Sequence, residues 1–198
     1  MIAPIRELEL ALAKLPGFGR RSASRAALAL VREGARLADP LVAALSAARE
    51  SVVCCSRCGA FTLVNENPCA ICVDETRETS SVCVVEDPSD ILSIESSGAF
   101  RGRYHALGGK LSTHKNATSV KQRIAQLIDR IALEDFNEVL LALSTDMEGD
   151  ATAGYISEML RHSGVRITRL AFGLPADSGV AYSDPLTLKR AIVNRIVQ

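Results

Sequence analysis

The chain carries no net charge of either sign, because its 198 residues include 23 Lys and Arg and 23 Asp and Glu. A neutral protein has no global field that draws it toward nucleic acid, so a DNA contact would need a local cluster of basic residues. The length allows one large domain or two to three small ones. Because 47% of the residues are hydrophobic, the chain can bury a core.

Long apolar runs are also absent from the sequence. No segment approaches the roughly 20 residues that span a bilayer, and residues 1–14 mix charged and apolar side chains at helical spacing, unlike a secretory signal. We therefore expect a cytoplasmic protein without membrane contacts. In a reducing compartment, the six cysteines are expected to be metal ligands or buried thiols and not disulfides.

Four zones of the chain differ in composition. Residues 1–53 are rich in Ala, Leu and Arg and predict helices, and residues 54–78 hold five of the six cysteines. Residues 79–173 alternate strand-like and helix-like segments. Residues 174–198 predict a loop followed by a short helix.

The third zone has the most regular pattern. β-branched and continuous apolar runs predict strands at 81–85, 104–107, 139–143 and 165–171. Helical periodicity predicts helices at 88–96, around 120–131 and at 151–161. Strands that alternate with helices predict an α/β domain, with a parallel sheet and helices on its faces.

The clearest motif is a pair of CxxC knuckles separated by ten residues, Cys55-Ser-Arg-Cys58 and Cys69-Ala-Ile-Cys72. Zn²⁺ prefers a tetrahedron of thiolates, and each CxxC turn directs two sulfurs toward one point. A turn at 65–68 can bring the second pair back to the first. Because all four ligands would be cysteine, no coordination position would remain open for catalysis, so we expect one structural zinc ion per chain.

Two alternatives remain open for these cysteines. A redox-active CxxC motif, or simple burial of the thiols, would use the same residue type. Cys54 could replace Cys55 as a ligand, although the symmetric spacing within each pair favours Cys55. Cys83 lies in an apolar strand candidate and is interpreted as a buried thiol.

The segment Leu15-Pro-Gly-Phe-Gly19 makes a tight turn between two predicted helices. Glycines bring backbone N–H groups close to a phosphate, and the N-terminus of the following helix adds its dipole. Residues 10–32 contain no Asp or Glu and carry a basic cluster made of Lys14, Arg20, Arg21, Arg25 and Arg32. The cluster predicts sequence-independent binding of the DNA backbone. The alternative is a helical corner with a solvated basic face.

Acidic residues follow two of the predicted strands. Glu86 and Asp87 come after the first strand, and the loop Ser144-Thr-Asp-Met-Glu-Gly-Asp150 comes after the strand at 139–143. Both groups lie at the carboxyl ends of strands, where folds with parallel sheets place functional groups. Their carboxylates could converge on a divalent ion, or they could cap helices and bind partners.

This order of strand, Glu, strand and acidic loop resembles the Toprim domain of topoisomerases and primases. Catalytic Toprim domains carry a Glu and an Asp-x-Asp pair for magnesium, and here Ser144 stands at the first Asp position while Asp146 remains. The missing acid favours a protein without catalytic residues and with at most a weak Mg²⁺ site at these acids. The alternative is a magnesium-dependent nuclease or strand-transfer enzyme, with Glu86 as acid/base and Asp146 and Glu148 on the metal.

The whole order of parts resembles one family of bacterial proteins. A helix-hairpin-helix precedes a four-cysteine zinc finger, a Toprim domain and a C-terminal tail, over almost the full length. The most specific matches are Leu15–Gly19, the two knuckles, Val84-Val85-Glu86, Gly102-Arg103-Tyr104, Glu148–Ala153 and Thr187-Leu188. By these motifs the chain resembles the RecR family of recombination mediators.

The resemblance implies a non-enzymatic clamp, a tetrameric ring around single- or double-stranded DNA at the bacterial nucleoid. Family members work with RecO and RecF to help RecA replace single-strand binding protein on gapped or single-stranded DNA. By position, Arg21 and Arg25 match residues that face DNA, and the tail and the N-terminal helices match ring-building contacts. Four acids match the Toprim surface used toward RecO and RecF, namely Glu86, Asp146, Glu148 and Asp150.

The sequence also departs from the family pattern. In the loop 113–119, residues 113–116 replace a Pro and a Gly-rich stretch, and residues 175–178 replace a more glycine-rich turn. Arg20 stands where Pro is common. The two loops are expected to affect partner contacts and not the fold.

Overall fold

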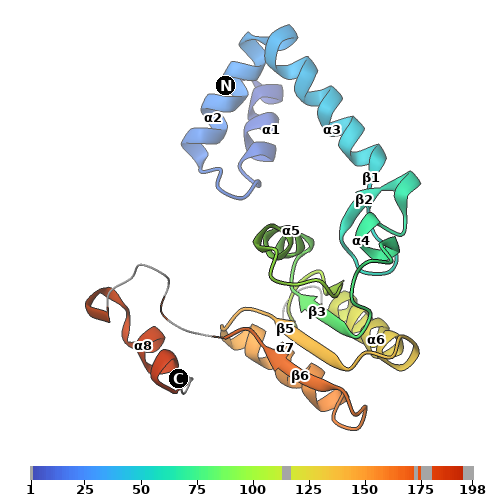
Figure 1. Cartoon of the computed structure of the whole chain (residues 1–198). Coiled ribbons are helices and arrows are strands. Elements are labelled where there is room, and N and C mark those ends of the chain that lie inside the picture. Colours follow the sequence, from blue (N-terminus) through green and yellow to red (C-terminus); the bar gives the residue numbers. More distant parts are fainter. Residues whose placement is uncertain (1, 113–116, 172–173, 175–179, 194–198) are drawn as a thin grey trace. The chain divides into compact units, whose positions relative to one another are not determined.

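The structure is a computed structural model that describes residues 2–112, 117–171, 174 and 180–193 (Figure 1). Residues 113–116 and 175–178, where the sequence departs from the family pattern, lie outside the described residues. The chain divides into two compact units, residues 1–53 and residues 54–198. None of the described helices combines the length and the apolar character that crossing a membrane requires.

The first unit is helical and has a small interior. α1 (Ala3–Leu12) packs against α2 (Arg20–Arg32), and a π-helical turn (Gly34–Ala38) leads into α3 (Asp39–Ser51). A proline lies in the first turn of both α1 and α3, where its missing N–H costs no intrahelical bond. Among the described residues of this unit, only Ala23 and Ala27 of α2 are fully buried.

The cysteine segment folds as a short hairpin with a helical turn. β1 (Val52–Cys54) pairs with β2 (Phe61–Leu63), a 3-10 turn (Val64–Glu66) follows, and α4 (Ala70–Val73) carries the second CxxC. Asn67 holds the return of the chain, because its side-chain oxygen accepts hydrogen bonds from the N–H and the hydroxyl of Ser56, both at 2.9 Å. A turn at the predicted place thus joins the two knuckles.

A four-stranded parallel sheet in the order β4-β3-β5-β6 forms the centre of the second unit. Its strands are β3 (Ser81–Val85), β4 (Arg103–Ala106), β5 (Glu138–Ala142) and β6 (Arg166–Arg169). This arrangement confirms the α/β fold class and the parallel sheet expected from the sequence. Because β3 and β5 are neighbours, the acidic segments that follow them emerge side by side.

The two faces of the sheet bury different elements. One core joins alternate residues of β3 and β5, such as Val84 and Leu141, to α6 (Ala117–Leu133) and α7 (Met147–Met159). The other core joins Cys83 and Val85 to α5 (Pro88–Ser97) and to the cysteine segment. Strand side chains alternate between faces with a period of two, so a sheet covered on both faces is apolar throughout.

The cysteine segment lies along the open side of β4, the edge strand of the sheet. The Ala106 N–H donates to the Cys58 carbonyl at 2.7 Å. The Arg103 guanidinium donates to the carbonyls of Ile71 and Cys72 at 2.7 and 3.2 Å. These bonds satisfy backbone groups on both the strand and the knuckles.

Some element boundaries differ from those expected. α7 begins at Met147 and not near 151, because the Asp146 carboxylate caps it by accepting from the Gly149 N–H at 2.8 Å. α5 begins behind a similar cap, in which Asp87 and Asp90 form a capping box. β6 is shorter than the expected 165–171. The short helix expected in the tail is α8 (Pro185–Val193), preceded by a 3-10 turn (Val180–Tyr182).

Candidate functional site

The structure brings the four cysteines of the two knuckles into one buried cluster. The Sγ atoms all lie within 4.8 Å of one another. The Cys55 and Cys72 sulfurs are 3.9 Å apart, and those of Cys58 and Cys69 are 3.5 Å apart. A tetrahedral zinc site with Zn–S bonds of about 2.3 Å needs sulfurs about 3.8 Å apart. The donor set and its spacing therefore fit a zinc ion.

The sulfurs interact with backbone N–H groups and with one another, and these contacts do not favour the thiolate at every position, because the pKa of Cys72 is raised like that of Cys58. Backbone N–H groups of Ala60 and Cys69 point at the sulfurs of Cys58 and Cys55, at 3.4 and 3.3 Å. The hydrogen bond from Cys58 lowers the pKa of Cys69 to about 2, and the same contact raises the pKa of Cys58 to about 12. A metal ion that displaces the shared proton would hold both groups as thiolates.

The two remaining cysteines lie outside the cluster. Cys54, the alternative ligand, is exposed. Cys83 is fully buried in β3, and burial raises its pKa to about 12, as the interpretation of a buried thiol requires. Among the described residues, the four-cysteine cluster is the only group of three or more His, Cys, Asp or Glu side chains placed to hold a metal.

The basic cluster of the hairpin forms an ordered stripe along α2. Residues 21, 25, 28 and 32 follow the 4-3-4 spacing of one helical face, so Arg21, Arg25 and Arg32 lie in line with Leu28. The buried residues Ala23 and Ala27 occupy the opposite face. All three arginines are exposed, and none forms an ion pair with another described residue.

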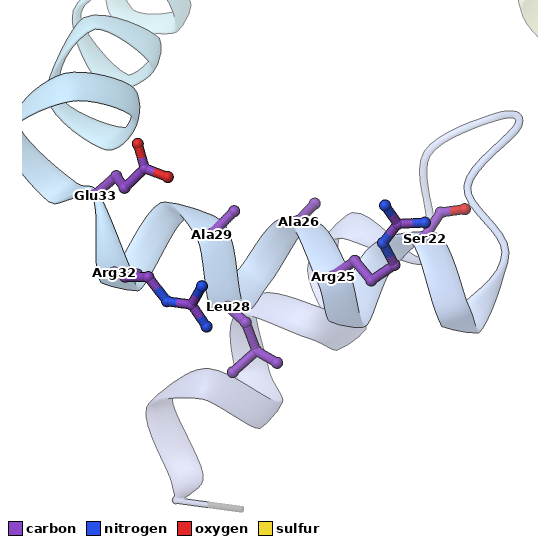
Figure 2. Close-up of a pocket in the computed structure, with 7 residues that line it drawn as sticks. All are labelled: Ser22, Arg25, Ala26, Leu28, Ala29, Arg32 and Glu33. Carbon is purple, nitrogen blue, oxygen red and sulfur yellow. The ribbon is translucent and has the colours of Figure 1, made fainter.

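A shallow groove of about 580 Å³ runs beside this stripe (Figure 2). Its lining includes Arg25 and Arg32, with the small side chains of Ser22, Ala26 and Ala29 further round the helix. Arg25 and Arg32 are seven residues apart, so their Cα atoms are separated by two helical turns, about 10.5 Å along the axis. Glu33 also lines the groove, next to Arg32, so the groove carries two positive charges and one negative charge.

The beginning of α2 breaks the usual rules for a helix N-terminus. Gly19 is the N-cap and supplies no side-chain acceptor, the first turn has no acidic residue, and Arg20 and Arg21 occupy it. Cations at this end oppose the helix dipole and destabilise the helix. Gly17, with φ +80°, makes the turn before it, and Lys14 lies exposed in the same turn. Arg20 points about 100° away from the stripe.

The acidic residues after β3 and β5 meet around a lysine. The Ser144 N–H donates to the Glu86 carboxylate at 2.5 Å. The Lys110 ammonium lies 2.5 Å from Asp146 and 3.9 Å from Glu86, and also reaches the Ser144 hydroxyl at 3.3 Å. The hydrogen bond from Lys110 lowers the pKa of Asp146 to about 2. A lysine ammonium thus already lies between the two carboxylates and neutralises one of their two negative charges.

The other acids of this loop lie apart from that lysine contact. Asp150 pairs with Arg169 of β6 at 2.9 Å. Glu148 is exposed in the first turn of α7. Gly149 is required at its position, because a Cβ there would overlap the Ser144 carbonyl. The loop is therefore fixed by a cap, two ion pairs and a close backbone approach.

His105 is a buried link between β4 and α6. Its Nδ1 lies 3.1 Å from the Arg130 guanidinium, and its Nε2 lies 2.8 Å from the Arg123 carbonyl. A guanidinium only donates, so Nδ1 accepts, Nε2–H donates and the ring is neutral. Burial, reinforced by the charges of Arg123 and Arg130, lowers its pKa to about 3.

Several residues at these sites carried no signal in the sequence. Lys110 is 36 residues from Asp146, and the partners of His105 lie on another element. These contacts join segments that are distant in the sequence, so no local spacing pattern predicts them.

Comparisons with known proteins agree with this architecture. Residues 80–171 match the family model described as the Toprim domain, which spans β3 to β6. A recombination protein RecR of Desulfatibacillum aliphaticivorans is 44% identical over 93% of this chain and 92% of its own length. The RecR of Methylobacterium radiotolerans is 41% identical, covering 96% and 94%, and that of Methylocella silvestris is 43% identical, covering 95% and 92%. At this identity and coverage, the chain belongs to the RecR family of recombination proteins.

Proposed function

We propose that the protein is a DNA-binding recombination mediator in DNA repair that acts as a ring-like clamp without turnover. The observation that carries the proposal is the exposed stripe of Arg21, Arg25 and Arg32, unpaired among the described residues and opposite the buried face of α2. Such a stripe contacts backbone phosphates and leaves base edges unread. This geometry supports sequence-independent binding.

The N-terminus of α2 supports the same proposal. Uncapped N–H groups, a glycine turn and two arginines in the first turn destabilise the isolated helix. They stabilise it when a phosphate binds there, because the N–H groups, the dipole and the guanidinium groups all favour an anion. Lys14 and Arg20 extend the positive surface around the turn.

Zinc is the metal that we propose for the four-cysteine cluster. Its role is structural, because four thiolates complete the coordination shell. The cysteine segment has few apolar residues of its own, so metal binding would supply most of its folding free energy.

Assembly into a homotetramer is supported by the apolar surface of the first unit. Val42 and Leu45 on α3 are each 62% exposed, and Leu10 and Val31 are 56% exposed. A unit with only two buried alanines among its described residues is too small to be stable through its own core, and self-association is a common remedy. Copies of the chain joined through these helices would build the proposed ring.

The acidic surface at the ends of β3 and β5 is the proposed contact for RecO and RecF. Glu148 is exposed, Glu86 and Asp146 contact Lys110, and Asp150 pairs with Arg169. Through these partners the clamp would promote loading of RecA in place of single-strand binding protein. The family resemblance supplies these names, and the exposed carboxylates supply a chemistry that basic partners can recognise.

The magnesium-dependent alternative is weakened by Lys110. A divalent ion at Glu86 and Asp146 would have to displace an ammonium that already contacts both carboxylates. Ser144 adds no negative charge, and two-metal chemistry needs more acidic ligands than these. DNA cleavage with Mg²⁺ that disappears in Glu86→Gln would overturn the proposal of a clamp without turnover.

The direct test replaces two arginines of the stripe. We expect Arg21→Ala/Arg25→Ala to weaken binding to fluorescent single-stranded DNA and to reduce the slope of log K against log salt by about 2, one for each lost phosphate contact. Zinc content and the circular dichroism spectrum should stay unchanged, since both side chains are exposed.

A matched control removes two other exposed arginines of the same unit, Arg6 and Arg49. This double variant changes the net charge equally but leaves the stripe intact, so its salt slope should match that of the wild type. Equal affinity of the Arg21/Arg25 variant and the wild type would remove α2 from the DNA interface. Equal losses of DNA affinity in both double variants would show that net charge, and not the position of the stripe, governs binding.

A further inference from the structure

One buried guanidinium nitrogen stands out in the second unit. Arg123 of α6 donates through Nε to the Ala106 carbonyl at 2.9 Å and through Nη1 to the Gln126 side chain at 2.6 Å. Its Nη2 is buried and is the only buried side-chain nitrogen or oxygen among the described residues without a hydrogen-bond partner.

This nitrogen lies over the first knuckle. A Cβ built on Gly59 would lie 2.8 Å from Arg123 Nη2 and 3.1 Å from the Ala106 carbonyl. Gly59 follows Cys58 directly and has φ +82°, a backbone conformation that favours glycine. The absence of a side chain at Gly59 leaves room for the guanidinium against the CxxC turn.

Arg103 of β4 is placed in the same way at the second knuckle. It is 7% exposed and donates to the carbonyls of Ile71 and Cys72. All hydrogen-bond partners found for Arg103 and Arg123 are neutral carbonyls or an amide. Within the described part of the chain, neither arginine forms an ion pair with a carboxylate.

The other arginines packed near the knuckles differ in this respect. Arg57 and Arg130 share the Glu134 carboxylate, each with a nitrogen 3.0 Å from one of its oxygens. A buried charge that lacks an opposite charge is costly, so charges inside proteins are normally paired or lie beside a metal site. The Asp74 carboxylate acts on Arg103 at longer range, but neither Arg103 nor Arg123 is ion-paired within the described residues, so a further negative charge close by would stabilise both.

A metal-thiolate centre supplies that charge. Four thiolates around one divalent cation leave a net charge of about −2. Arg103 and Arg123 contribute one positive charge each, one beside each knuckle. A cluster of neutral thiols or a pair of disulfides would supply no such charge.

We propose that Arg103 and Arg123 are the counter-ions of the metal-thiolate centre and that this charge pairing fastens the cysteine segment to β4 and α6. The two arginines act as positioning residues, because Arg103 donates to the backbone of the second knuckle, Arg123 lies close to Gly59 of the first, and neither is a metal ligand. The pairing rests on the zinc proposed above, and it makes metal affinity depend on residues outside the cysteine segment.

The test measures metal affinity in the full-length, zinc-loaded protein. Arg123→Met keeps much of the side-chain length and removes the charge. We expect a loss of zinc affinity of about 10-fold or more in competition with a chromogenic chelator, the usual size of an effect from residues around a metal site. Arg123→Lys keeps the charge and should recover most of the affinity. Lys121→Met removes an exposed charge from the same helix and should bind zinc like the wild type.

Each outcome decides the matter. Zinc affinity of Arg123→Met within about 2-fold of the wild type would overturn the pairing, and so would an equal loss in Arg123→Lys, which would point to packing. If Arg123→Met lacks the wild-type circular dichroism spectrum, Arg123→Gln is judged by the same criteria. A wild-type protein that contains no zinc would defeat the metal assignment itself, whereas zinc-loaded protein with unaffected variants would defeat only the charge pairing.

Discussion

The two units of this chain differ in the contacts that stabilise them. The second unit buries a parallel sheet between two apolar cores and holds its cysteine segment by hydrogen bonds to an edge strand. In the first unit, only two alanines among the described residues are fully buried, while apolar side chains of α1, α2 and α3 stay exposed. The second unit thus contains its own stabilising contacts, whereas the first exposes the groups that it would use to bind.

The two units also differ in whether their charged groups have partners inside the fold. In the second unit, charged groups such as Lys110, Arg130 and Glu134 have partners inside the fold. In the first unit, the arginines of α2 have none among the described residues, and Arg20 and Arg21 oppose the helix dipole. The N-terminus of α2 thus violates the usual capping and dipole preferences at the place where we expect a ligand to bind. The following predictions test this contrast, in order of decreasing effect on the fold.

Removal of the metal should have the largest effect. Cys69→Ser breaks the four-thiolate cluster, and we expect loss of the zinc and a fall in Tm of more than about 10 °C, because several kcal/mol of metal binding are lost and each shifts Tm by about 2–4 °C at this size. Metal analysis and calorimetry measure both. Cys54→Ser, at the neighbouring exposed cysteine, should keep the metal and the Tm. A metal-free protein with the wild-type Tm would contradict the role assigned to the centre.

Two glycines of α7 should respond differently to substitution by alanine. In Gly149→Ala the new methyl group overlaps the Ser144 carbonyl, so we expect a loss of about 1–3 kcal/mol, as for other overpacked sites. Gly154→Ala on the same helix meets no atom within 4 Å and should be neutral or add up to about 1 kcal/mol, since alanine is the better helix former. Urea unfolding separates the two, and similar values for both would show that the loop adjusts.

The buried histidine should make the second unit sensitive to acid. The pKa of His105 is about 3 in the folded protein and about 6.5 in an unfolded chain. The unfolded state therefore binds the extra proton between these values, so stability is present above about pH 6.5 and falls as the pH is lowered, by about 2 kcal/mol at pH 5. Urea unfolding of the wild type and of His105→Gln across this range measures the histidine's share. Parallel curves for the two proteins would assign the acid sensitivity to other groups.

Substitution on the exposed face of α3 should change assembly. Leu45→Glu places a charge on the apolar surface of the first unit, and we expect a smaller mass in light scattering together with a lower stability of the first unit, because self-association no longer supports it. Ala43→Glu adds the same charge about 200° round the helix and should keep the larger mass. An unchanged mass for Leu45→Glu would mean that α3 is not a contact between copies.

Local patterns in the sequence predicted most of the fold. Helical and strand periodicity located β3, α5, α6 and β5 closely, because each pattern depends only on neighbouring residues. CxxC spacing grouped the four cysteines for the same reason. It could not show that Lys110 lies between Glu86 and Asp146, or that Arg123 lies over Gly59. Such contacts join distant segments, and their geometry depends on the packing of the sheet.

The hydrogen bond from the Ala106 N–H to the Cys58 carbonyl also protects the protein against aggregation. β4 is the edge of the sheet, and the cysteine segment covers its open side. A chain that loses its metal would expose a bare strand edge to other chains, and bare edges add strands from neighbours. Loss of the proposed zinc would therefore favour aggregation of the protein.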